Sequence, residues 1–303
     1  MNTPNQICAL CGQPRQLCLS HIIPKFVIEW LKDSSPSHIR SGENPNRRVQ
    51  DGLKTELLCS DCEQLFSDWE HKFAETIFIP FHSNRTQEFK PIRYEKWALK
   101  FAVSVSWRTL QWFRPQLVES FPLERLKVID SALAIWREFL LDTRKHPENF
   151  EQHLLPFDLI ETIDAPNMSP NINRYFLTTI DVDLPNTEMT LFVYSKMCKL
   201  VLLGILQVPT RDQKIWRGTK LHVNNGYFPS TKRLVMPDNV MEYISNRANQ
   251  AFALLAGVSP RQKAKIAESI ENNFDTIAES EVFRALNQDV LLFGKAAFAG
   301  KSS

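Results

Sequence analysis

The chain has 303 residues, which is enough for two or three domains, and its 43% hydrophobic and 23% charged residues are ordinary for a globular protein. The net charge of +2 excludes binding of nucleic acid through overall basic charge, so such a ligand would need a local basic patch. With only 9 glycines and neither a GxGxxG nor a GxxxxGK[ST] motif, the sequence argues against a glycine-rich phosphate-binding fold.

The sequence shows no charged segment followed by an apolar run at its amino terminus, so we expect no signal peptide. The longest apolar runs, such as residues 198–206, are too short to span a bilayer. We therefore expect a cytoplasmic protein that has no membrane partner and keeps its thiols reduced.

Four of the six cysteines form two CxxC pairs, Cys8/Cys11 and Cys59/Cys62. Each pair can present both sulfurs from one tight turn, and four thiolates match the closed tetrahedral site of structural zinc. The sequence therefore predicts a zinc ion that ties the first part of the chain into a loop. Cys18 lacks a CxxC partner and, like Cys198, is expected to be a small buried side chain.

Residues 1–90 are expected to form the first unit. A hairpin holds the first CxxC pair, and a strand over 16–23 ends at Pro24, which cannot donate to a ladder. The remaining expected elements are a short amphipathic helix over 25–33, a loop over 34–52 and an amphipathic helix that starts near the second CxxC pair and runs to 78.

Residues 91–165 are expected to be helical. Pro91 and Pro122 are placed to open helices with apolar stripes, over 92–113 and 123–140. Their tryptophans are interpreted as core residues rather than as base-stacking groups.

Residues 166–303 are expected to form an α+β unit, with helices over 238–256, ending at Gly257, and from Pro260 onward. The apolar run over 199–208 fits a strand or a buried helix, and periodicity does not decide between them. The other expected strands cover 174–183, 189–197 and 215–223, the last followed by a turn at 224–226.

His21 is the main candidate for a catalytic residue. It lies near the end of the first expected strand, which the zinc site would pin beside the helix that carries Glu63. An imidazole can act as a general base near neutral pH, and the carboxylate of Glu63 could hold a hard divalent ion. A base and a metal ion that stabilises the leaving oxygen suffice, in principle, for phosphodiester hydrolysis.

The same residues have a purely structural interpretation. Four-cysteine zinc sites are mostly structural, and His21 would then only form a hydrogen bond to a cysteine sulfur or to the backbone. Glu63 at a helix start is also favoured by the helix dipole. Asp51 and Asp61 are weaker candidate ligands, and His71 lies two helical turns beyond Glu63, too far to reach the metal.

The pattern Cys8-x-x-Cys11, Ser20-His21-Ile22-Ile23-Pro24, and Leu57-Leu58-Cys59-x-x-Cys62-Glu63 resembles the HNH (ββα-metal) endonucleases that carry a four-cysteine zinc site. The resemblance covers about the first 80 residues. It implies a treble-clef-like ββα zinc unit, His21 as the general base that activates water, and Mg²⁺ or Mn²⁺ as the catalytic ion. The sequence around these motifs also resembles uncharacterised bacterial proteins often associated with defence against phage or mobile DNA.

Three positions depart from the family pattern. The residue before the base is commonly a metal-binding His or Asp and here is Ser20, and the residue after the last cysteine is commonly a metal-binding His and here is Glu63. The Asn that usually precedes the second CxxC pair and orients the base has no counterpart, since the chain offers Thr55 or Glu56 there.

A short basic stretch before the second CxxC pair could face DNA phosphates or could simply be a solvated loop. It consists of Arg40, Arg47, Arg48 and Lys54. The carboxylates of Asp181 and Asp183 share one strand face and more often face solvent than bind a metal. The remaining histidines are expected at the surface; they are His38, His82, His146, His153 and His222.

We therefore expect a mixed α+β protein in which the zinc unit is followed by a helical middle and an α+β carboxyl region. The favoured function is a metal-dependent endonuclease that acts on DNA. The first alternative is a catalytically inactive zinc module that recognises nucleic acid or a protein partner, and the second places the chemistry in residues 166–303. The carboxyl region could serve recognition, regulation or association with a second copy.

Overall fold

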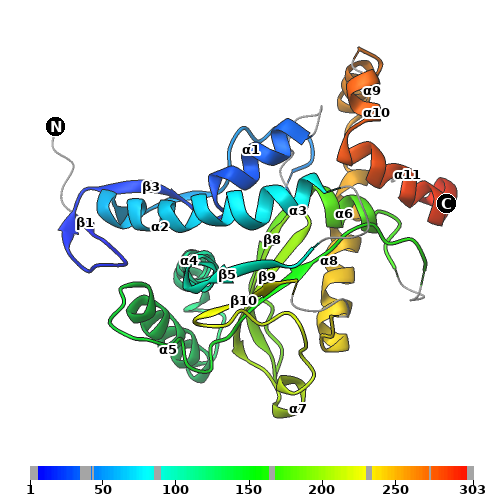
Figure 1. The fold of residues 1–303 in the computed structure, drawn as a ribbon. Coiled ribbons are helices and arrows are strands. Elements are labelled where there is room, and N and C mark those ends of the chain that lie inside the picture. Colours follow the sequence, from blue (N-terminus) through cyan, green and yellow to red (C-terminus); the bar gives the residue numbers. More distant parts are fainter. Residues whose placement is uncertain are drawn as a thin grey trace.

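The computed structural model of the chain is a mixed α+β fold, as the sequence predicts (Figure 1). It describes residues 6–34, 42, 44–84, 90–163, 168–229, 234–272 and 274–298.

The amino-terminal unit is built from two antiparallel pairs of short strands and two helices. Its elements are β1 (Gln6–Ile7), β2 (Pro14–Arg15), β3 (Leu17–His21), α1 (Lys25–Ser34), β4 (Lys54–Cys59) and α2 (Ser60–Phe73). β1 pairs with β2 around the first CxxC turn, and β3 pairs antiparallel with β4. Because α2 follows β4 with no intervening loop, the second CxxC pair lies at the junction of strand and helix.

A long rod of helix leaves this unit and runs across the molecule (Figure 1). It is made of α2, the π-helical segment η1 (Ala74–Phe78) and α3 (Ile79–Ser83). Aromatic rings join it to its neighbours: Phe73 stacks on Phe101 with centroids 3.8 Å apart, and Phe26 meets Phe78 edge to face at 5.0 Å. These contacts bury apolar area between α1, the rod and the next helix, α4.

The helical middle contains α4 (Lys96–Phe113), the 3-10 turn η2 (Arg114–Leu117) and α5 (Leu123–Leu140). α5 begins after Pro122, as predicted, but the prediction that Pro91 opens a helix is wrong. Residues after Pro91 form the strand β5 (Ile92–Glu95), which pairs with β10 (Asn225–Phe228) far along the chain. Tyr94 is buried there and its hydroxyl accepts a hydrogen bond from the backbone of His222 at 3.1 Å.

A four-stranded antiparallel sheet forms the centre of the molecule, in the order β6-β9-β8-β7. Its strands are β6 (Gln152–Pro156), β7 (Ile180–Asp183), β8 (Leu191–Met197) and β9 (Leu200–Gln207). Alternate residues of β9 enter two different cores: Leu200, Leu202 and Leu206 face one, and Val201, Leu203 and Ile205 face the other. The run that the sequence left undecided is therefore a strand buried on both faces.

Residues 174–183 do not form the single strand that the sequence predicts. They split into α6 (Ile172–Thr178) and β7. The carboxylate of Asp289, distant in sequence, accepts hydrogen bonds from the backbone N–H groups of Asn173 and Arg174 at 2.8 and 3.2 Å. These N–H groups belong to the unpaired first turn of α6, so a tertiary contact stabilises a helix that local propensity does not predict.

The strand predicted over 215–223 is also wrong. This segment follows the short helix α7 (Thr210–Gln213) and makes only isolated bridges, at Arg217 and Lys220. The asparagine-glycine pair that suggested a turn instead begins β10, which pairs with β5.

The carboxyl-terminal helices cover the second face of the sheet and extend beyond it (Figure 1). They are α8 (Asp238–Ala256), α9 (Pro260–Asn272), α10 (Phe274–Ala278) and α11 (Glu281–Phe293), followed by the 3-10 turn η3 (Gly294–Ala297). α8 ends at Gly257, and the Ser259 hydroxyl accepts a hydrogen bond from the Gln262 N–H at 3.3 Å, as the capping pattern predicts.

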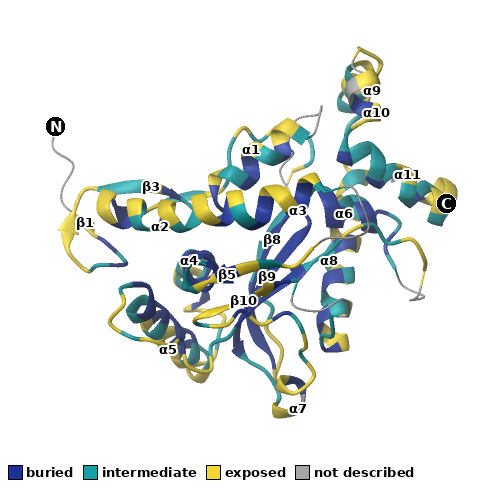
Figure 2. Ribbon diagram, in the orientation of Figure 1, coloured by how far each residue is buried: buried dark blue, intermediate teal, exposed yellow. Residues whose placement is uncertain are grey.

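Burial follows these layers, with α4 and the central strands the most buried elements (Figure 2). The expectation of surface histidines is wrong for His82 and His153, which are 2% and 1% exposed. It holds for His146 and His222, which are exposed, while His38 lies outside the described residues. No helix in the described part of the chain has the length and apolar character needed to cross a membrane.

Candidate metal centre and the His21 site

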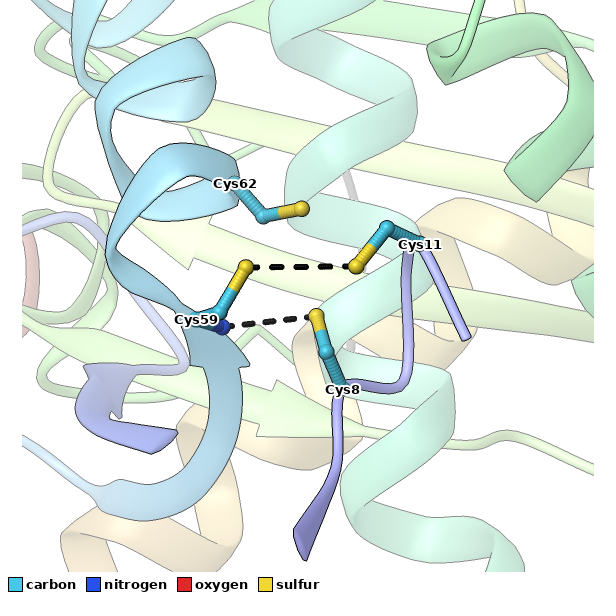
Figure 3. A group of neighbouring side chains, drawn as sticks. All are labelled: Cys8, Cys11, Cys59 and Cys62. Atoms are coloured by element: carbon cyan, nitrogen blue, oxygen red, sulfur yellow. Dashed lines mark hydrogen bonds between the residues drawn. The ribbon is translucent and has the colours of Figure 1, made fainter. Parts of the chain in front are cut away.

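The two CxxC pairs converge at one point, where the sulfurs of all four cysteines lie within 4.8 Å of one another (Figure 3). The first pair comes from the turn between β1 and β2, and the second from the β4–α2 junction. Gly12 closes the first turn with φ of +77°, a left-handed conformation that glycine adopts without strain, and its N–H donates to the Cys8 carbonyl at 2.9 Å.

The spacing of the sulfurs fits a tetrahedral ion. With zinc–sulfur bonds of about 2.3 Å, neighbouring sulfurs in a tetrahedron lie about 3.8 Å apart. The Sγ atoms of Cys11 and Cys59 are 3.9 Å apart, which is far beyond a disulfide bond, and all four thiols are free. Three of the four are buried, and among the described residues this is the only such group of three or more ligand-type side chains.

The surroundings of the thiols also favour a bound cation. Burial opposes ionisation of Cys8, but backbone N–H groups, including that of Cys59 at 3.3 Å, lower its pKa to about 7. Burial and the neighbouring sulfurs raise the pKa of Cys62 well above its usual range. Four clustered thiols cannot all lose their protons beside one another without a positive charge between them, and a zinc ion would supply that charge.

Helices of the middle unit hold this centre in place. The guanidinium of Arg137 on α5 donates a hydrogen bond to the carbonyl of Leu10, inside the first CxxC turn. The metal unit is therefore packed against the rest of the protein.

His21 is the last residue of β3, and its side chain is 16% exposed. Its Nε2 lies 2.8 Å from Oδ1 of Asp51, whose other oxygen binds the ammonium group of Lys54. The hydrogen bonds from Lys54 and His21 hold the pKa of Asp51 well below its usual range, against the opposing effect of burial. Asp51 is therefore a carboxylate at neutral pH, and the Nε2–H of His21 donates to it, which leaves Nδ1 as the nitrogen that can accept a proton.

Ser20 and Glu63 meet on the other face of β3. Successive side chains of a strand point to opposite faces, so Ser20 turns toward α2 while His21 turns toward the 51–54 segment. The hydroxyl of Ser20, which is 1% exposed, donates to Oε1 of Glu63 in the first turn of α2. No hydrogen bond or ion pair joins His21 to Glu63 in the described part of the chain.

Arg108, on the buried side of α4, contacts the backbone of His21. Its guanidinium donates to the backbone carbonyl of His21 at 3.0 Å and pairs with Glu70 at 2.6 Å. The same group lies over the ring of Phe66, 5.3 Å from its centroid. The helical middle thereby fixes the backbone at the end of β3.

The other candidate residues lie in different settings. Arg47 and Arg48 are exposed, Lys54 is paired with Asp51, and Arg40 lies outside the described residues. His71 is 72% exposed on α2. Asp61, on the first turn of α2, is exposed.

Asp181 and Asp183 are only partly exposed, and other side chains occupy their carboxylates. They bind Arg247 on α8, at 2.5 and 3.3 Å, and accept hydrogen bonds from the hydroxyls of Tyr175 and Tyr243. Their charge is thus partly compensated within a structural network.

Sequence reasoning ranked Asp51 low and did not identify Arg108. A signal for Asp51 existed, because antiparallel pairing of β3 with β4 places His21 opposite Lys54, and Asp51 lies just before that strand. No local signal pointed to Arg108, since only tertiary packing brings α4 to β3. No protein-family model matches this chain, and no curated protein or solved structure is significantly similar to it.

Proposed function

We propose that this protein is a metal-dependent endonuclease of the HNH type that hydrolyses phosphodiester bonds of DNA, with His21 as the general base. The observation that carries the proposal is the hydrogen bond between His21 and Asp51 at the end of a strand pinned by the four-cysteine centre. In the proposed unit, the paired strands β3 and β4 and the helix α2 would form the treble-clef-like ββα arrangement around a structural zinc ion.

In this proposal, Asp51 and Arg108 hold His21 in position. Asp51 keeps the imidazole in the orientation in which Nδ1 can take a proton from the attacking water, much as an aspartate orients the histidine of a hydrolytic triad. It thereby occupies the orienting role for which the sequence offers no Asn. Arg108 fixes the carbonyl of the same residue, so the base is held by its side chain and its backbone.

Ser20 and Glu63 support a position for the catalytic ion on the opposite face of β3 from the His21 side chain, so the scissile phosphate would have to lie across the end of this strand to reach both. The resemblance assigns metal binding to these two positions, and their side chains contact each other. One carboxylate and one hydroxyl, completed by water, fit Mg²⁺ or Mn²⁺, which keep several waters in most protein sites. When bound, such an ion would stabilise the charge on the leaving oxygen.

Cleavage of supercoiled plasmid by the purified protein with Mg²⁺ or Mn²⁺ tests the proposal. We expect the wild type to nick or linearise the plasmid and His21→Ala to lose at least about a hundredfold in rate, the usual contribution of a general base. His71→Ala is the matched control, since that histidine is exposed on α2 and outside the site. Equal cutting by wild type and His21→Ala, or no cutting by either, would refute the proposal.

One observation favours a second candidate, the zinc module without catalysis. Glu63 and Ser20 supply a single charged ligand, and the described residues hold no other cluster of three ligand-type groups than the four cysteines. Salt-sensitive DNA binding without cleavage would support that candidate.

A further inference from the structure

The fold brings together two basic segments that are more than 200 residues apart in the sequence. The side-chain amide of Asn46 donates to the carbonyl of Gly257 at 2.9 Å and accepts from the N–H of Ser259 at 2.8 Å. Pro45 lies beside Gly257. The loop that carries Arg47 and Arg48 is therefore docked on the junction between α8 and α9.

The start of α9 adds basic groups at this junction. Arg261, Lys263 and Lys265 are exposed, and the first turn of the helix contains no acidic residue. Among the side chains of this helix whose burial is described, Gln262, Ile266 and Ser269 are half-buried, so the basic residues flank its packed side. The partial positive charge of the helix amino terminus adds to theirs.

These cations have no ion-pair partner among the described residues. In the described part of the chain, no carboxylate forms an ion pair with Arg47, Arg48, Arg261, Lys263 or Lys265. Two segments that carry five such cations are thus docked on each other in a protein whose net charge is only +2. The loop continues from Arg48 to Asp51, the partner of His21, so this basic surface and the His21 site belong to one connected segment.

We propose that the 44–48 loop and the start of α9 form one surface that binds the phosphate backbone of duplex DNA and leads it to the His21 site. The inference rests on the proposed function, since the DNA it holds is the substrate of that site. It assigns to the carboxyl-terminal region a role in substrate binding, through cations that contact phosphates and carry no sequence readout.

Salt-dependent binding of the full-length protein to a short duplex tests the surface, measured by fluorescence anisotropy without added divalent ions so that no cleavage is needed. The test variant is R261Q/K263Q/K265Q. The matched control R93Q/K145Q/K214Q removes the same charge from exposed positions on β5 and in the loops after α5 and α7, which lie away from α9 in Figure 1. All six positions are exposed, so the variants should fold, and thermal melting checks this.

Each phosphate contact contributes about 0.9 to the slope of log K against log salt, so the test variant should lose up to about 2.7 from the slope of the wild type. Its affinity at about 0.1 M salt should fall at least tenfold, while the control keeps the slope of the wild type. Equal losses in both variants, or a wild type that binds without salt dependence, would overturn the inference. Failure of the nuclease proposal is separate, because it would show as absent plasmid cleavage while the slope difference remained.

Discussion

Replacing Arg108 with methionine should destabilise the protein far more than removing an arginine whose acidic partner is exposed. The change keeps a long unbranched side chain but removes the partner of Glu70 and the donor to the His21 carbonyl. The side chains of Arg108 and Glu70 are 2% and 18% exposed, so their 2.6 Å pair is shielded from solvent.

The expected loss of stability follows from the charge of Glu70, which stays buried without its partner. Removing one partner of a buried ion pair costs about 3–5 kcal/mol, because the other charge stays buried without compensation. Arg108→Met should therefore lower the free energy of unfolding by about that amount. Removing both charges should cost much less than the sum of the single changes, which gives a coupling energy of at least about 2 kcal/mol.

Urea denaturation of Arg108→Met, Glu70→Gln and the double variant measures this coupling, with an unchanged m-value as the check on two-state behaviour. Arg114→Met is the matched control. Its partner Asp130 is 54% exposed, so it should cost at most about 1 kcal/mol. If Arg108→Met costs no more than the control, or if the coupling energy is near zero, the assigned role of Arg108 is wrong.

Three further predictions concern other parts of the structure. Asp51→Asn should reduce plasmid cleavage by about 10² to 10⁴ in rate while zinc content stays unchanged, and a rate like that of the wild type would remove Asp51 from the site. Burial lowers the pKa of His82 to about 3, with Nδ1–H donating to the Phe78 carbonyl and Nε2 accepting from the Lys199 N–H. The folded pKa lies below the unfolded value of about 6.5, so at pH values between these two only the unfolded state binds a proton at His82. The free energy of unfolding therefore falls as pH drops, by about 2 kcal/mol at pH 5. His82→Gln should flatten that loss in acid denaturation curves, and an unchanged pH dependence would contradict the reasoning. Gly204→Ala should lower the free energy of unfolding by about 1–3 kcal/mol in urea denaturation, since a Cβ there would lie 2.7 Å from the Ser106 hydroxyl and 3.0 Å from Trp136. A neutral effect would show that the core relaxes freely.

The sequence was most informative where local chemistry and local structure coincide. CxxC spacing and the expectation of reduced thiols predicted the four-cysteine cluster, and the proline, glycine and serine signals around α5, α8 and α9 marked their ends correctly. These features depend on neighbours within a few residues. They can therefore be read without knowledge of the tertiary fold.

The errors arose where distant segments decide the outcome. The N-terminal turn of α6 is held by Asp289, β5 forms because β10 pairs with it, and His82 is buried beside the β8–β9 hairpin. The site shows the same division. His21, Ser20 and Glu63 were identified from motif positions, whereas Arg108 reaches His21 only through packing of α4 on the amino-terminal unit.

The metal content of the purified protein tests the central claim most directly, because both the proposed site and its position depend on an ion at Cys8, Cys11, Cys59 and Cys62. Mass spectrometric elemental analysis of full-length protein prepared without added metal should find about one zinc per chain, and Cys59→Ser/Cys62→Ser should lose it together with the cooperative unfolding transition. A folded wild-type protein without bound zinc, with the same melting curve before and after chelator treatment, would contradict the account.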